Sequence, residues 1–266
     1  MLCVVGNVWC VTRLHDVVYM VCIGSATITR FNATTHQPLT DLDNISIVKM
    51  LSGKWDMAAC ERTSYLYVAD VKCVWRASPY ATDPTDDDVM RHLLPKSSLD
   101  SYTPHTLSVT STRLLVTSPD THQLIQFDAN GFELRRVQLP RDMEPQHAVE
   151  SPTGTFIVSL HNAQLKQNQV AEVNTGGKVL RQFSGSRLTS LGVTPHVAVD
   201  SHGNVFVVDQ TNRRILLLDN RLSLRRVIID EHQLNYKPWR LCYREDKGQL
   251  LVGLLGGVAV FDVLCR

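Results

Sequence analysis

Residues 194–227 read TPHVAVDSHGNVFVVDQTNRRILLLDNRLSLRRV, and they match residues 103–137, which read TPHTLSVTSTRLLVTSPDTHQLIQFDANGFELRRV. In both segments a Pro-His pair precedes three apolar runs separated by polar turns, the third run ends in Asp, and Leu-Arg-Arg-Val closes the segment. Short runs of Val, Ile, Leu and Phe between Gly, Asn and Asp are typical of β-strands joined by tight turns. The chain therefore repeats one small antiparallel sheet.

Four weaker copies of this pattern are in phase with the first two. Their first apolar runs step along the chain by about 42–49 positions, a period that is typical of β-propeller blades. The six units lie at approximately 7–50, 54–95, 103–139, 145–184, 194–230 and 238–263. Because they take up nearly the whole chain, we predict a single domain over residues 1–266, an all-β, six-bladed β-propeller of four-stranded antiparallel blades.

The two ends of the chain indicate how the ring closes. The last unit ends at Asp262, too near the C-terminus for a fourth strand, whereas the apolar segment 1–5 precedes the first unit. We predict that residues 1–5 supply the missing outer strand of the last blade. The Leu-Arg-Arg-Val segments at 134–137 and 224–227 are also predicted as outer strands, because charge on an edge strand opposes edge-to-edge pairing.

Composition narrows the class of protein. The chain has 266 residues, 44% of them hydrophobic and 20% charged, with a formal net charge of +1. This balance gives no general attraction to nucleic acid or to an anionic membrane, and the N-terminus lacks the pattern of a secretory signal. The seven cysteines show no C-x-x-C spacing, which favours reduced thiols. We expect a cytoplasmic protein with no membrane association, monomeric as an isolated domain.

Six residues begin the first strands of the units at positions that the sequence aligns, and they read Trp9, Asp56, His105, His147, His196 and Arg240. The innermost strands of a propeller line its channel, so these side chains are expected to ring a channel mouth and form a binding site. His105, His147 and His196, with Asp56 or water as a fourth ligand, would suit a zinc ion with an open position for catalysis. The alternative is three histidines hydrogen-bonded around a water-filled channel, with no cofactor.

Aromatic and basic residues suggest two further surfaces. Tyr236, Trp239 and Arg240 lie together ahead of the last unit and form a candidate binding patch with an aromatic anchor. RNA binding needs a basic, partly aromatic face, and the basic pairs of the chain stand at 135–136, 213–214 and 225–226. Alternation sends neighbouring side chains of a strand to opposite faces, so a structural role at the sheet edge is the alternative for these arginines.

The segment VFVVDQTNRRI at residues 205–215 resembles the NHL repeat, in which a strand ends in Val-Ala-Asp, Asn and Arg-Ile follow, and the next strand ends in Asp. Val208 stands where the family has Ala, and YVAD at 67–70 keeps the first half of the pattern. The resemblance implies a six-bladed propeller. The family includes protein- and RNA-binding modules of tripartite-motif ubiquitin ligases, extracellular propellers, and a zinc-dependent lyase of peptidyl-α-hydroxyglycine with zinc-binding histidines in similar Pro-His pairs.

The motifs of common enzymes are missing from the sequence. It contains no G-x-S-x-G, P-loop or H-E-x-x-H pattern, and no Cys/His array of a RING or B-box. We therefore expect a non-catalytic scaffold that presents loops and a channel mouth to a protein or RNA partner, within an assembly of the ubiquitin-ligase type that other chains or other parts of the protein would complete. The alternative is a metal-dependent lyase or hydrolase that works at the histidine ring.

Overall fold

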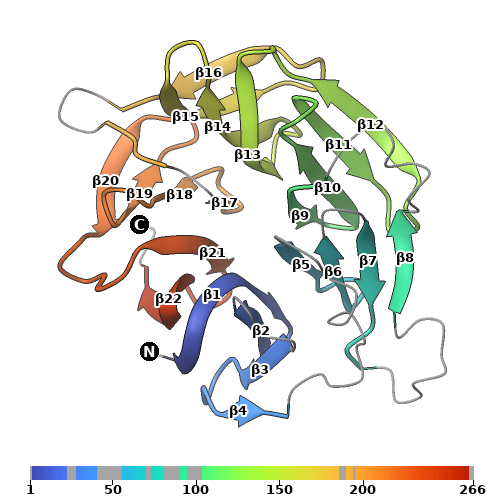
Figure 1. Cartoon of the computed structure of the whole chain (residues 1–266), viewed down its shortest axis with the longest axis vertical. Coiled ribbons are helices and arrows are strands. Elements are labelled where there is room, and N and C mark those ends of the chain that lie inside the picture. The colour runs from blue at the N-terminus through green and yellow to red at the C-terminus, as the bar shows by residue number, and fades with distance from the viewer. Residues whose placement is uncertain are drawn as a thin grey trace.

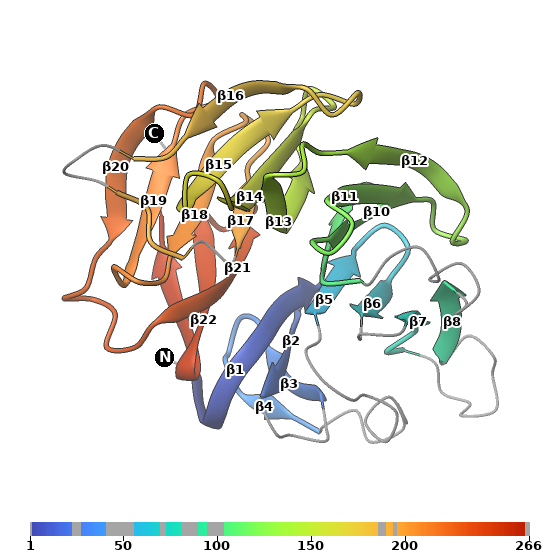
Figure 2. The same ribbon diagram turned by 45° about the horizontal axis from the view of Figure 1, so that its top comes forward.

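The computed structural model describes residues 2–22, 28–40, 56–69, 73–80, 90–94, 104–185, 190–193 and 196–263. Over these ranges the regular structure is β-strand, arranged as five antiparallel sheets around a central axis (Figure 1). Figure 2 tilts the ring and shows the sheets standing beside one another. The described part of the chain has no helix long and apolar enough to cross a membrane. The predicted all-β propeller of small antiparallel sheets is confirmed.

Four sheets have four strands each, paired in chain order. The second unit forms β5 (Asp56–Cys60), β6 (Tyr65–Ala69), β7 (Val74–Ala77) and β8 (Met90–Leu94). The third forms β9 (Thr106–Thr110), β10 (Arg113–Ser118), β11 (Gln123–Phe127) and β12 (Glu133–Gln138). The fourth forms β13 (Met143–Glu150), β14 (Phe156–Asn162), β15 (Gln167–Val173) and β16 (Val179–Phe183). The fifth forms β17 (Val197–Val199), β18 (Val205–Asp209), β19 (Arg214–Leu218) and β20 (Leu224–Ile229). The Leu-Arg-Arg-Val segments lie in β12 and β20, which are edge strands as predicted.

The first and last units share one six-stranded sheet. Its strands, in order across the sheet, are β21 (Pro238–Arg244), β22 (Gln249–Asp262), β1 (Leu2–Leu14), β2 (Val17–Cys22), β3 (Ile28–Asn32) and β4 (Pro38–Leu39). The prediction of six separate four-stranded blades is therefore wrong, and the described residues form five hydrogen-bonded sheets.

Two long strands explain this difference. β1 pairs with β22 at its start and with β2 from Val8 onward, so it passes from the last unit into the first without a break. The two ends of β22 meet, since the N–H of Val263, directly after the strand, donates to the carbonyl of Gly248, directly before it, over 2.6 Å. Gly256 and Gly257 have φ of 107° and 150°, a backbone region that glycine adopts readily. The repeat counts six units, but these continuous strands join two of them.

The N-terminal residues pair with the last unit, as the sequence predicted. Leu2 lies opposite Val258 and Cys3 opposite Gly257. We expect deletion of residues 1–6 to lower the free energy of unfolding by about 1–2 kcal/mol, because a ladder hydrogen bond contributes roughly 1 kcal/mol net. Urea denaturation measures this loss, and hydrogen exchange should show weaker protection of the β22 amides. An unchanged unfolding midpoint would contradict the role of this segment in closing the ring.

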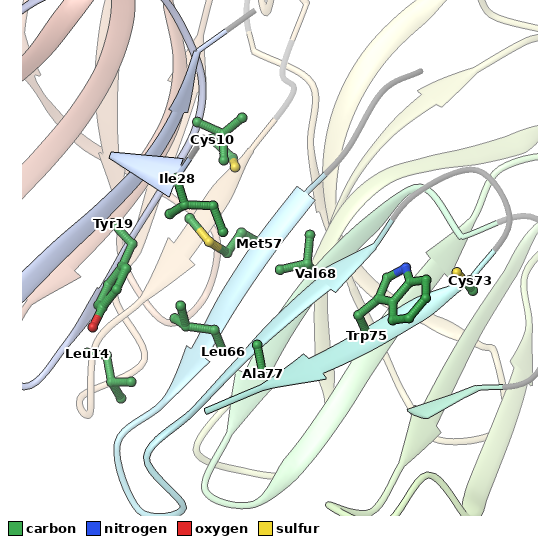
Figure 3. Close-up of a cluster of buried hydrophobic side chains, with 11 residues drawn as sticks. Cys10, Leu14, Tyr19, Ile28, Met57, Leu66, Val68, Cys73, Trp75 and Ala77 are labelled. Atoms are coloured by element: carbon green, nitrogen blue, oxygen red, sulfur yellow. The ribbon is translucent and has the colours of Figure 1, made fainter. Parts of the chain in front are cut away.

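The hydrophobic core lies between neighbouring sheets. Figure 3 shows one such cluster, in which Tyr19 and Ile28 of the first unit pack against Met57, Leu66 and Val68 of the second. These five side chains are at most 4% exposed. Comparable clusters lie between the other pairs of neighbouring units. Burial of apolar faces against both neighbours holds the sheets in a ring, since none can bury both faces alone.

The NHL-like residues of the fifth unit form a structural clamp. Asp209 is fully buried, and its carboxylate accepts hydrogen bonds from the Gly192 N–H at 3.1 Å, the Asn212 amide at 2.8 Å and Arg214 Nε at 2.8 Å. These contacts fasten the segment before β17 to the turn after β18. The Asn and Arg of the motif therefore satisfy a buried carboxylate, as a charged group removed from water requires.

Candidate functional site at the channel mouth

Six inner strands surround the channel. They contact one another around the axis in the order β1, β5, β9, β13, β17 and β21, and β21 contacts β1 again (Figure 1). Each four-stranded sheet contributes one of them, and the six-stranded sheet contributes β1 and β21. The ring of inner strands is therefore closed although the sheets number five.

The register of the sheets fixes which residues are equivalent at the channel mouth. The first apolar residue of an inner strand pairs with a central residue of the second strand, as Met57 does with Val68 and Leu241 with Val252. The residue before it occupies the same place in every unit. We define these six residues as the mouth layer, and they are Cys10, Asp56, Thr106, His147, His196 and Arg240. His196 is half-buried and the other five are buried.

Two residues that the sequence placed in this ring lie one position before the mouth layer. The first is Trp9, which is skipped by the register shift between Val8 and Cys10, and the second is His105. Thr106, not His105, pairs with Thr117 at the start of β9. At Trp9 a β-bulge adds one residue to the strand, so counting along the sequence loses the equivalence that the ladder keeps. β9 pairs with β10 without a register shift, and His105 precedes its first ladder pair.

Asp56 and Arg240 form a buried ion pair across the mouth layer. Arg240 Nε donates to Asp56 Oδ1 over 3.1 Å, and the two side chains are 7% and 1% exposed. The second carboxylate oxygen, Oδ2, accepts the backbone N–H of Leu107 at 2.9 Å. The carboxylate therefore joins β5, β9 and β21, which compensates both charges in a place with little water.

His147 is held by backbone groups on both sides. Its Nε2 lies 3.2 Å from the carbonyl of Leu107, and its Nδ1 lies 3.4 Å from the N–H of Val197. These partners require the neutral tautomer that carries its proton on Nε2. Burial, only partly offset by the charge of Asp56, lowers the pKa of His147 to about 4. The imidazole is thus a neutral link between β9 and β17.

The other two predicted histidines lie in different surroundings. The ring of His196 stacks on that of His147 with centroids 3.6 Å apart and planes at 25°. Burial, then the proximity of His147 and Arg240, lowers the pKa of His196 well below its usual value. His105 is half-buried outside the layer, with Nδ1 3.3 Å from the carbonyl of Gln146. The structure therefore brings His147 and His196 together.

The geometry of the histidines does not suit a shared metal ion. Both ring nitrogens of His147 face backbone groups, and nearly parallel stacked rings direct their lone pairs side by side instead of toward one point. The described residues contain no group of three His, Cys, Asp or Glu side chains that could hold a metal ion. We derive no metal-dependent step, and zinc stays a prediction of the sequence that metal analysis of the purified protein tests.

An aromatic patch lies beside the mouth layer. Trp9 and Trp239 stack with ring centroids 5.6 Å apart, and both are half-buried. Tyr236 is 47% exposed, and its ring passes close to Gly256, where an added Cβ would lie 3.6 Å away. Tyr236 stands three positions before Trp239 in the chain, and we define Trp9, Tyr236 and Trp239 as the aromatic patch. Arg240, which the sequence grouped with Tyr236 and Trp239, points into the buried ion pair instead.

Sequence reasoning missed two members of the mouth layer. Cys10 is 1% exposed, and burial together with the charge of Asp56 raises the pKa of its thiol. Thr106 is equally buried and donates to the carbonyl of Gln146 at 2.9 Å. The apolar residue at the centre of each second strand could have located them. Val68, for example, pairs with Met57 of the inner strand, and the residue before Met57 belongs to the mouth layer. The Pro-His pairs, by contrast, precede the first ladder pair.

Comparison with known proteins shows the fold and leaves the family open. No family model matches the chain, and no curated protein matches it. Three solved structures share its fold. They are a streptogramin B lyase (10% identity, TM-score 0.66, 96% of this chain and 93% of that chain), a chain of a nidogen/laminin complex (14%, 0.65, 88% and 84%), and a β-propeller domain from Myceliophteria thermophila (11%, 0.57, 97% and 86%). At these identities the likeness concerns the propeller fold alone.

Proposed function

We propose that this propeller is a non-catalytic binding module of the NHL type that docks a protein partner on its aromatic patch. The observation that carries the proposal is the difference in exposure between the polar and the aromatic side chains at the channel mouth. Asp56, His147 and Arg240 are buried and bonded to protein groups, whereas the aromatic residues beside them are partly exposed. A catalytic acid or base must reach the substrate proton, and these three groups instead hold the inner strands together.

The aromatic patch has the chemistry of a protein-docking site. Trp and Tyr are enriched among the residues that contribute most to protein–protein binding, because they bury a large rigid surface. The indole N–H groups of Trp9 and Trp239 are buried and have no hydrogen-bond partner among the described residues. The nidogen/laminin structure supports protein binding by this fold as a precedent only.

A protein partner is favoured over RNA by the state of the basic residues. Arg136 pairs with Glu133 at 2.7 Å, and Arg214 pairs with the buried Asp209 at 2.8 Å. Phosphate binding would require these guanidinium groups to leave their carboxylates. The net charge of +1 adds no general attraction to a polyanion.

The setting that we propose is a reducing compartment, the cytoplasm. Five of the described cysteines form no disulfide, and they are Cys10, Cys22, Cys60, Cys73 and Cys242. Thiols of this kind are typical of a compartment that keeps cysteine reduced. The resemblance to tripartite-motif NHL modules supports a partner that belongs to a ubiquitin-ligase assembly, and mass spectrometry of the captured partner tests that point.

Replacement of Tyr236 by Ala is expected to weaken partner binding about tenfold, because an exposed aromatic anchor would be lost. The measurement is affinity capture from lysate with quantitative mass spectrometry, followed by titration of the identified partner. Phe132→Ala is the matched control, since Phe132 is also an exposed aromatic residue, at 69%, but stands beside the outer strand β12. Loss of the partner after RNase treatment would assign binding to RNA, and equal binding by Tyr236→Ala and wild type would reject the aromatic patch.

A further inference from the structure

A cleft of about 540 Å³ lies between the fourth and fifth units. The fourth unit contributes the turn after β13 and residues of β14, β15 and β16, and the fifth unit contributes two turns, at 201–203 and 220–221. The turns after β13 and β17 follow the ends of inner strands, whereas the mouth layer stands where the inner strands begin. The cleft therefore lies toward the face of the propeller opposite the aromatic patch.

Asn220 is the point at which the two units meet in this cleft. Its carbonyl accepts a hydrogen bond from Nη1 of Arg181, on β16, over 3.0 Å. The other turn of the fifth unit also touches it, since a Cβ added at Gly203 would lie 3.2 Å from the Cβ of Asn220. The outer strand of the fourth unit and both turns of the fifth unit are thus held in fixed positions around the cleft.

Three of the exposed side chains that line the cleft are hydrogen-bond donors. The side chain of Arg181 is 50% exposed, and its Nε and Nη2 donate no hydrogen bond within the described part of the chain, where Nη1 makes its contacts. Arg221 is exposed on the turn beside it. The side chain of His202 is 80% exposed and comes from the other turn of the fifth unit. Donors from three separate segments therefore line one cleft.

The carboxylates around the cleft are already engaged by protein groups. Glu172 is the one acidic residue among the described residues that line it, and Glu172 is 7% exposed and pairs with Arg181 at 3.0 Å. Asp200, Asp219 and Glu245 lie nearby and accept backbone N–H groups of the two turns at 2.9–3.1 Å. A ligand in the cleft would therefore meet exposed donors, while the lining carboxylate is buried and neutralised.

We propose that this cleft binds a phosphate monoester, whose oxygens accept hydrogen bonds from Arg181, Arg221 and His202. Guanidinium groups suit phosphate because they offer paired N–H donors and a fixed charge, and three terminal oxygens can contact all three segments. The cleft is much larger than a phosphate ion, so it has room for the group that carries the phosphate. A small molecule and a phosphorylated protein side chain share this chemistry. The proposal does not depend on partner docking at the aromatic patch.

Four probes test this proposal on the full chain: phenyl phosphate, benzoate, a capped tripeptide with phosphoserine between two glycines, and the same tripeptide with serine. Both phosphorylated probes are expected to bind saturably and to shift the backbone amide resonances of Gly203 and Arg221. Benzoate should bind about tenfold more weakly, because it offers one oxygen and one charge fewer, and the serine tripeptide should not bind. Tighter binding of phenyl phosphate would indicate a small-molecule source, and tighter binding of the phosphoserine tripeptide a protein source; both rankings support the site.

Substitution of Arg221 by Gln removes one guanidinium group and leaves the pair of Arg181 and Glu172 intact. The variant should bind phenyl phosphate about tenfold more weakly, the effect of one charge-assisted hydrogen bond. Arg225→Gln removes the same charge from an exposed position on β20 outside the cleft, and as the control it should bind like wild type. The proposal is overturned if phenyl phosphate does not bind saturably, if benzoate binds as tightly, or if both variants lose the same affinity, which would mean general attraction between charges.

Discussion

Replacement of Asp56 by Asn is expected to lower the free energy of unfolding by about 3–5 kcal/mol. Asn keeps the shape of the side chain and can still accept the Leu107 N–H, but it removes the charge that faces Arg240 at 3.1 Å. The Arg240 guanidinium would then remain buried without this carboxylate, and a buried charge deprived of its counter-ion is strongly destabilising. Urea denaturation at neutral pH, followed by circular dichroism, measures the loss.

A double-mutant cycle shows whether the loss comes from the ion pair. Arg240→Met alone should also be strongly destabilising, and Asp56→Asn with Arg240→Met should cost much less than the sum, because replacing both buried partners is often nearly neutral. Glu133→Gln is the control, since it breaks the exposed pair with Arg136, at 2.7 Å, and should cost at most about 1 kcal/mol. Additive losses in the cycle would refute a direct coupling of Asp56 and Arg240.

The same ion pair is a feature that the sequence could not predict. The repeat at 194–227 predicted the class of fold, because each unit carries its own strand and turn pattern. It could not predict that Asp56 meets Arg240, since the two residues are 184 positions apart and belong to units that the ring does not place next to each other. Nor could it predict one six-stranded sheet, because the continuity of β1 and β22 depends on how the ring closes.

The structure places four of the six residues of the predicted ring in the mouth layer, and it places Trp9 and His105 one position before that layer. An inner strand that begins with a bulge shifts the count by one, so Trp9 was aligned where Cys10 belongs. The role of the histidines was left open, and the structure shows a physical reason for that ambiguity. A Pro-His pair at the start of a strand can supply a free imidazole or, as at His196, one stacked on a neighbour.

Acidification is expected to destabilise the protein through His147. Its pKa lies at about 4 in the folded chain, below the ordinary value of 6.5 that applies when it is unfolded. Between these values the unfolded chain binds a proton that folded His147 does not, so stability falls as the pH falls through this window. Lowering the pH from about 7.5 to about 5 should remove about 2 kcal/mol on this account. Well above pH 6.5 the histidine is neutral in both states, and its contribution to stability is constant.

Substitution by Gln isolates this effect, because the Gln amide can donate to the Leu107 carbonyl and accept from the Val197 N–H without titrating. His147→Gln should therefore lose about 2 kcal/mol less than wild type over the same pH change, whatever its stability at neutral pH. His196, whose pKa is lowered in the same direction, should keep part of the acid sensitivity in this variant. His232→Gln, at an exposed position, is the control and should follow the wild-type curve. Parallel pH curves for wild type and His147→Gln would contradict this prediction, because they would mean that His147 binds a proton as easily in the folded chain as in the unfolded one.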